Sequence, residues 1–148
     1  MSDFEINFFT QNNQHVRLSK EKIRAWIGHI IHCENKHIKH AEINYIFCND
    51  DYLLTLNRQY LQKETFTDVI AFDYCEKNII KGDIFISYER IRENAENFNQ
   101  KTRKELMRVM AHGLLHLLGY KDKKPEERKE MSLKEDYYLE KFLEIAKN

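Results

Sequence analysis

Two histidines and one aspartate in the last third of the chain have the spacing of metal ligands. His112 and His116 lie four residues apart, so a helix would place both imidazoles on one face, one turn apart. Gly119 follows where that helix should end, since glycine readily takes the left-handed conformation of a helix stop. The chain then turns back, and Asp122 lies three residues further on. This H-x3-H-x2-G-x2-D pattern predicts one zinc ion (Zn2+) held by His112, His116 and Asp122.

The chemistry of such a site follows from the number of its ligands. Three protein ligands leave a fourth zinc position for water, which is typical of catalytic rather than structural sites. The spacing is that of the metzincin proteases, but Gly113 stands where a protease has its general-base glutamate. Glycine inside a helix costs about 1 kcal/mol relative to alanine, so Gly113 indicates a close approach by substrate or backbone. We therefore predict a small hydrolase in which His112, His116 and Asp122 act through zinc-bound water, and not a peptidase.

The other metal-binding residue types lack a comparable pattern. Four histidines lie on or after the first predicted helix without a third ligand beyond them, and we expect ordinary surface or packing roles for His29, His32, His37 and His40. The cysteines are odd in number and lack C-x2-C spacing, which indicates reduced, small buried residues in a cytosolic protein at Cys33, Cys48 and Cys75.

The composition is that of one ordered, helix-rich domain. The chain has 148 residues, and we expect a single domain over residues 1–148 with one continuous core. Its 24 basic and 24 acidic residues give a formal net charge of zero, which provides no global attraction to nucleic acid. No apolar run approaches the roughly 20 residues of a membrane span, and no signal-type segment is present at the N-terminus. We therefore expect a cytoplasmic protein without membrane contact.

Hydrophobic periodicity predicts the elements that must position the ligands. Alternating apolar and polar residues predict strands over 4–8, 42–48, 68–74 and 79–86, with a hairpin loop at 76–78. Apolar residues at helical spacing, together with capping residues and Pro125 at the expected starts, predict helices over 20–34, from about 50, over 88–97, from about 102 through the two histidines, and over 125–145. This order is typical of an α+β fold, and we expect a small, mostly four-stranded sheet covered by about five helices.

Polar residues at the expected helix starts support these boundaries. Ser19, Asn49 and Ser87 each precede a predicted helix, where a short polar side chain caps the first turn. Thr102 and Glu105 have the spacing of a capping box at the start of the metal-binding helix.

Three sequence blocks together resemble the YbeY family, the bacterial rRNA-maturation endoribonucleases. They are Thr-Asp-Val-Ile-Ala-Phe at 67–72, Gly-Asp-Ile at 82–84 and His-Gly-x-x-His-Leu-x-Gly-Tyr at 112–120, within a resemblance that extends from about Leu53 onward. The resemblance implies a zinc-dependent endoribonuclease that acts on single-stranded RNA in 16S rRNA 3′-end maturation and ribosome quality control. It also implies the small ribosomal subunit and its assembly factors as partners.

Two positions depart from the pattern of that family. The family usually has a third histidine where this chain has Asp122, and a carboxylate is also a normal zinc ligand, so the site is kept with altered electronics. The family usually has an arginine where this chain has Leu61, and such an arginine would clamp phosphate or stabilise developing negative charge. Arg58, three residues earlier, is the candidate substitute if the local helix aims it inward.

Two questions stay open at this point. RNA phosphates would be held by basic residues near the motif, although a solvated surface explains each of them equally well: Lys101, Arg103, Lys104, Arg108, Lys121, Lys123 and Lys124. Asp68 and Asp83 are expected to be structural. The alternative function is a non-catalytic ribosome-assembly factor whose zinc mainly fixes the fold, an alternative that Leu61 in place of arginine favours.

Overall fold

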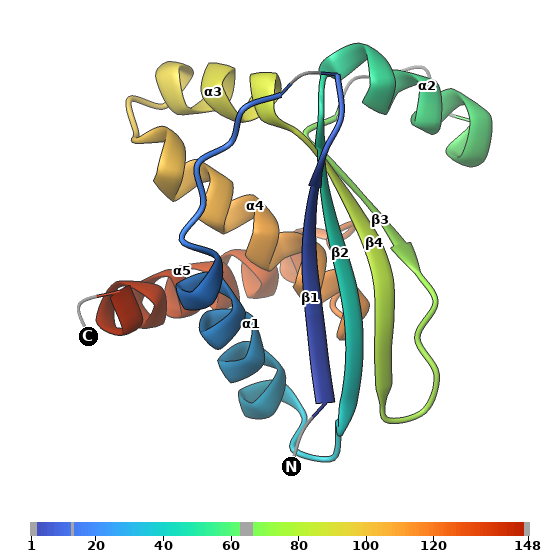
Figure 1. The fold of residues 1–148 in the computed structure, drawn as a ribbon, viewed down its shortest axis with the longest axis vertical. Helices are drawn as coiled ribbons and strands as arrows, with labels where there is room; N and C mark the ends of the chain where they lie inside the picture. The colour runs from blue at the N-terminus through green and yellow to red at the C-terminus, as the bar shows by residue number, and fades with distance from the viewer. Residues whose placement is uncertain (1–2, 13, 63–66, 147–148) are drawn as a thin grey trace.

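Four strands and five helices make up the part of the chain that the computed structural model describes, residues 3–12, 14–62 and 67–146 (Figure 1). In chain order they are β1 (Asp3–Thr10), α1 (Lys20–Glu34), β2 (His40–Cys48), α2 (Asp50–Leu61), β3 (Val69–Asp73), β4 (Ile79–Ser87), α3 (Tyr88–Asn97), α4 (Thr102–Leu117) and α5 (Pro125–Ala146). Each predicted strand and helix is present. Among these helices, none is long and apolar enough to cross a membrane.

The strands form one mixed sheet in the order β1-β2-β4-β3. The first three are parallel, and β3 pairs antiparallel to β4 at one edge. Parallel neighbours need a crossover connection, which α1 supplies between β1 and β2, whereas a short hairpin suffices between β3 and β4. The hairpin turns at 76–78, as predicted, with Asn78 at φ 60°. The predicted α+β class with a four-stranded sheet is therefore confirmed.

The main core lies between one face of the sheet and α1, α4 and α5. Alternate side chains of β2 point into it and are fully buried: Ala41, Ile43, Tyr45 and Phe47. The indole of Trp26 in α1 donates a hydrogen bond of 2.7 Å to the carbonyl oxygen of Tyr138 in α5, which joins two of the covering helices. In Figure 1, α2 lies on the other side of the sheet. There it covers a smaller cluster of Cys48, Leu53, Leu56 and Ile70.

A glycine lets α4 lie close to the sheet. A Cβ atom at Gly113 would come within 2.7 Å of Ile84 Cγ2 in β4, closer than carbon atoms can approach. The close approach expected at Gly113 is therefore real, but it is made by a side chain of the sheet rather than by substrate or backbone. The result is that His112 and His116 are carried close to β3 and β4.

The predicted helix caps are only partly confirmed. The side chain of Asn49 accepts a hydrogen bond from Tyr52 N, and that of Ser87 accepts one from Arg90 N. Ser19 precedes α1, but its side chain forms no capping hydrogen bond. The capping box at Thr102 is wrong, because Lys101 occupies the cap position and the side chain of Glu105 turns into the interior, with 8% of the residue exposed.

The three cysteines are free thiols in different environments. Cys48 is buried, which raises its pKa to about 12, and Cys75 is half-buried, with a pKa of about 11 for the same reason. Cys33 is exposed, so the expectation that every cysteine would be buried is wrong at this position.

Candidate metal centre

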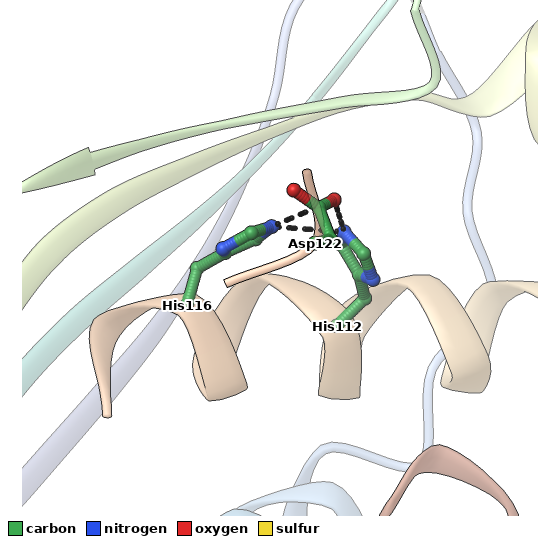
Figure 2. Close-up of side chains that lie close together, drawn as sticks. All are labelled: His112, His116 and Asp122. Atoms are coloured by element: carbon green, nitrogen blue, oxygen red, sulfur yellow. Dashed lines mark hydrogen bonds and ion pairs between the residues drawn. The ribbon is translucent and has the colours of Figure 1, made fainter. Parts of the chain in front are cut away.

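His112, His116 and Asp122 converge on one point above the C-terminal half of α4 (Figure 2). The two Nε2 atoms of the histidines are 3.0 Å apart. Asp122 Oδ2 lies 3.2 Å from His112 Nε2 and 3.3 Å from His116 Nε2. Figure 2 shows both imidazoles rising from the same face of the helix toward the carboxylate. The structure thus brings together all three residues that the sequence spacing selected.

The turn that ends α4 reverses the chain and brings Asp122 back to the two histidines. The N–H of Gly119 donates to the carbonyl oxygen of His116 at 3.0 Å, and the N–H of Tyr120 donates to that of Leu115 at 3.0 Å. This pair of hydrogen bonds is the Schellman motif, which requires a left-handed residue just beyond the helix. Gly119 supplies it with φ 106°. The chain then reverses, and Asp122 reaches the ligand face of α4.

The donor set fits a zinc ion. Ligands at the usual zinc distances of about 2.0–2.1 Å in a tetrahedral site lie roughly 3.3 Å from one another. The three ligand atoms here are separated by 3.0–3.3 Å. The side chains are 22%, 30% and 37% exposed, for His112, His116 and Asp122 respectively, so the fourth side of the site faces solvent. This is the arrangement of a site with an accessible position rather than a closed structural one.

The second nitrogen of each imidazole has its own partner. His112 Nδ1 is 2.7 Å from Glu135 Oε2, and His116 Nδ1 is 3.0 Å from the carbonyl oxygen of Tyr120. With Nδ1–H donating in both rings, both Nε2 lone pairs point to the shared centre. Burial alone would lower the pKa of His112, but the hydrogen bond and negative charge of Glu135, with Asp122 beside it, raise that pKa.

Glu135 was missed by sequence reasoning and connects the centre to α5. Its other oxygen, Oε1, accepts a hydrogen bond of 2.9 Å from Arg108 Nη1, and Arg108 also pairs with Asp136. One sequence signal pointed to it. Glu135 falls on the apolar stripe of α5, four residues after Met131 and four before Leu139, where a charged residue is out of place unless it has a partner.

A cleft of about 820 Å³ opens onto the three ligands. Its wall comes from β3, from the loop after α4 and from the last turns of α2, where Asn57 and Leu61 line it. Leu61 is 44% exposed at this wall. Arg58 is an exposed residue in the last turn of α2, next to Asn57 and one turn before Leu61, which line the cleft. A role for Arg58 in the reaction therefore stays a prediction.

Five of the seven basic residues near the motif separate into three environments, and the other two, Lys123 and Lys124, are exposed. Lys121 lines the cleft beside Asp122. Arg108 is engaged by two carboxylates, as described above. Lys101, Arg103 and Lys104, at the start of α4, line cavities other than this cleft, and Arg103 lies 5.5 Å over the ring of Phe142.

Two carboxyl groups lie beside His112, one of them half-buried (Asp68) and the other buried (Glu105). Asp68 lines the cleft and, together with Glu105, a small adjoining cavity of about 110 Å³. Burial raises the pKa of both groups. Asp83 is elsewhere, on the open face of the sheet, where its carboxylate accepts a hydrogen bond of 2.9 Å from Asn44. This contact agrees with the structural role expected for Asp83.

The described part of the chain contains one such ligand group. Within residues 3–12, 14–62 and 67–146, no other set of three histidine, cysteine or acidic side chains has its ligand atoms close enough to share an ion. His40 pairs with Asp3 at 3.1 Å, and His29 lies against Cys33, in line with ordinary surface roles.

Known proteins resemble this chain over most of its length. The family model described as "Endoribonuclease YbeY" matches residues 8–143. Endoribonuclease YbeY of Phocaeicola vulgatus is 45% identical over 134 residues, which cover 90% of this chain and 96% of that protein. The same enzyme of Flavobacterium psychrophilum is 52% identical over 117 residues, covering 79% and 82%. The solution structure of a Thermotoga maritima protein superposes with a TM-score of 0.63 at 28% identity, covering 93% and 88%.

Proposed function

Because this chain belongs to the YbeY family of endoribonucleases, which are metal-dependent hydrolases, we propose that it cleaves single-stranded RNA with one bound zinc ion. The observation that carries the proposal is the convergence of His112, His116 and Asp122 at the mouth of an open cleft. The protein would act in 16S rRNA 3′-end maturation and ribosome quality control in the cytoplasm, with the small ribosomal subunit and its assembly factors as partners. Residues 1–148 would act as one catalytic domain.

The chain's own residues have distinct tasks in this proposal. His112, His116 and Asp122 hold the ion, which supplies Lewis-acid activation of the phosphate or of water when bound. Lys121, at the cleft beside the ligands, neutralises a backbone phosphate. Leu61 and the β3 wall exclude water from one side of the cleft and leave room for an extended strand. Arg58, in the last turn of α2 with the cleft-lining Asn57 and Leu61, is the candidate for stabilising developing negative charge.

A peptidase is disfavoured by the position that follows His112. A protease of this motif needs a general-base glutamate there. In this chain the position is Gly113, whose α-carbon faces Ile84 of the sheet, so a longer side chain would enter the core rather than the cleft.

A non-catalytic assembly factor is favoured by one observation, the aliphatic Leu61 at the cleft wall, where the resemblance to the family implies an arginine. The nuclease and the assembly factor would use the same metal centre and both would bind RNA, so they differ only in whether the RNA is cleaved. RNA binding without cleavage by the zinc-loaded chain would support the assembly factor.

The deciding experiment joins metal analysis to an RNA cleavage assay. The wild-type chain is expected to carry about one zinc and to cut an unstructured RNA. His116→Ala should lose most of the metal and the cleavage, because two remaining ligands hold zinc poorly. His37→Ala is the matched control, since this exposed histidine lies outside the ligand group. Full zinc occupancy in His116→Ala would overturn the metal site, and zinc without cleavage would overturn the nuclease.

A further inference from the structure

A buried carboxylate interrupts the apolar stripe of α5. The stripe packs against the core through Met131, Tyr138, Leu139 and Phe142, and Glu135 lies among them with 6% of its surface exposed. Burying a carboxylate costs free energy unless it is hydrogen-bonded and paired with a positive charge. An aliphatic residue at this position would avoid that cost, so the contacts of Glu135 indicate what it contributes instead.

Both oxygens of Glu135 are used. Oε2 accepts from His112 Nδ1 at 2.7 Å, and Oε1 accepts from Arg108 Nη1 at 2.9 Å. Arg108 is held in turn by Asp136, one residue further along α5. Arg108 therefore holds one oxygen of the Glu135 carboxylate, and the other oxygen is directed at His112.

We infer that Glu135, held by Arg108, is a positioning residue that orients His112 for metal binding. The hydrogen bond keeps the proton of the ring on Nδ1, so Nε2 presents its lone pair to the point shared with His116 and Asp122. A carboxylate partner also makes the imidazole a stronger electron donor than a neutral acceptor would. The inference rests on the proposed metal site and adds that Glu135 contributes to the affinity of this site for zinc.

The two histidines differ in how they are held. His116 donates to the backbone carbonyl of Tyr120, which no side-chain substitution removes. His112 depends on a side chain from another helix. The docking of α5 on α4 therefore affects the ligand geometry, and Glu135 is the point at which that coupling can be tested.

The test measures zinc affinity by chelator competition on the full chain. Glu135→Gln keeps the shape of the side chain but loses its charge, and it should weaken zinc binding by about 10- to 100-fold, the usual effect of an outer-sphere partner. Glu105→Gln is the matched control. It removes a carboxyl group of similar burial from the same small cavity, and no hydrogen bond among the described residues joins Glu105 to either histidine.

A spectroscopic readout separates positioning from general stability. With Co2+ in place of zinc, the visible absorption bands report the ligand geometry. They should change in Glu135→Gln and stay unchanged in Glu105→Gln. If Glu135→Gln fails to fold, Arg108→Lys replaces it, since this variant keeps the positive charge but loses the planar fork that holds both Glu135 and Asp136.

The possible results are distinguishable. Wild-type affinity and wild-type Co2+ bands in Glu135→Gln would overturn the positioning role while leaving the proposed function intact. Equal losses in Glu135→Gln and Glu105→Gln would overturn it as well, because the effect would then be one of charge alone. A wild-type chain that binds neither ion would overturn the proposed function and this inference together.

Discussion

At the residue scale, the proposed metal centre combines side chains of different charge. The two imidazoles are neutral when they bind a metal, whereas Asp122 contributes one negative charge at 3.2–3.3 Å from both of them. Asp122 is also the most exposed of the three and the only ligand outside α4. Its contribution to affinity therefore depends on the loop that Gly119 starts.

Substitutions of Asp122 test whether it is a ligand. Asp122→Ala should lower zinc affinity by more than the roughly 10- to 100-fold that an outer-sphere partner contributes. Asp122→His should keep the affinity within about tenfold of wild type, because imidazole is an equally normal zinc ligand. Chelator competition measures both, and unchanged affinity in Asp122→Ala would show that the carboxylate only hydrogen-bonds within the turn.

A second prediction concerns Leu61, which lines the cleft at a position where the resemblance to the YbeY family implies an arginine. Leu61→Arg should change the free energy of unfolding by no more than about 0.5 kcal/mol, because the side chain is 44% exposed and its new charge can remain in solvent. RNA cleavage should rise as the guanidinium approaches the phosphate.

The control for Leu61→Arg is Leu133→Arg, which adds the same charge at a 60% exposed leucine on α5. Urea unfolding and an RNA cleavage assay are the measurements. A loss of stability well above that of Leu133→Arg would mean that Leu61 contributes to packing, and equal cleavage in the two variants would rule out a specific effect at the cleft.

The convergence of the three proposed ligands was predictable from the sequence because they are local. His112, His116 and Asp122 lie within one helix and the turn that follows it, so spacing alone predicted that they meet. The partners of these ligands were not predictable in this way. Glu135 is 23 residues from His112 along the chain, and its contact depends on how α5 crosses α4.

At the element scale, Glu34 ties together the end of α1, the loop after α4 and α5. The carboxylate of this last residue of α1 accepts hydrogen bonds from Tyr120 OH at 2.5 Å, from Tyr138 OH in α5, and from Lys134 Nζ at 3.2 Å. Tyr120 is also the residue whose carbonyl holds His116. The end of α1 therefore helps to fix the loop that carries Asp122.

This network predicts a pH-dependent contribution to stability. Burial alone would raise the pKa of Glu34, but the hydrogen bonds from Tyr120, Tyr138 and Lys134 lower it below 4.5. A carboxyl whose pKa is lowered on folding stabilises the fold above its unfolded pKa. That stabilisation is lost as the pH falls through the folded value.

Glu34→Gln should therefore reduce the free energy of unfolding by roughly 2 kcal/mol at about pH 7, the scale of hydrogen bonds to a charged group. The difference from wild type should shrink well below pH 4.5, where the wild-type carboxyl is also protonated. Urea unfolding at several pH values measures it, with the exposed Glu21→Gln on the same helix as control. A difference that is independent of pH would show that the charge of Glu34 is not involved.

The predicted bounds of an element agreed with the structure where many residues of that element carried the same pattern. Apolar periodicity placed α1 at its observed bounds, since several residues contribute to it. Single-residue signals were less dependable. Thr102 and Glu105 have the spacing of a capping box, but the side chain of Glu105 is buried in the protein interior instead. Tertiary packing therefore outweighs the small free energy that a helix cap contributes.

At the scale of the whole molecule, binding of RNA has to be local. The formal net charge is zero, so attraction to a polyanion depends on where basic residues gather. The sequence placed one basic group at the start of α4 and another around Asp122, but it gave no way to judge which one faces the metal. The structure separates them, because Lys121 lines the cleft while Arg103 and Lys104 line cavities elsewhere.

The last prediction distinguishes these two groups by salt dependence. Each phosphate contact releases counterions, so the slope of log affinity against log salt reports how many contacts a variant has lost. Lys121→Glu should weaken binding of an unstructured RNA and reduce the slope by about one. Lys104→Glu should change the slope less, because Lys104 lies roughly 12 Å along the axis of α4 from His112 and outside the cleft lining. Lys39→Glu, at an exposed lysine before β2, is the control for net charge. A larger change in Lys104→Glu than in Lys121→Glu would mean that RNA approaches the metal along the start of α4, and the cleft would then hold only the end of the strand.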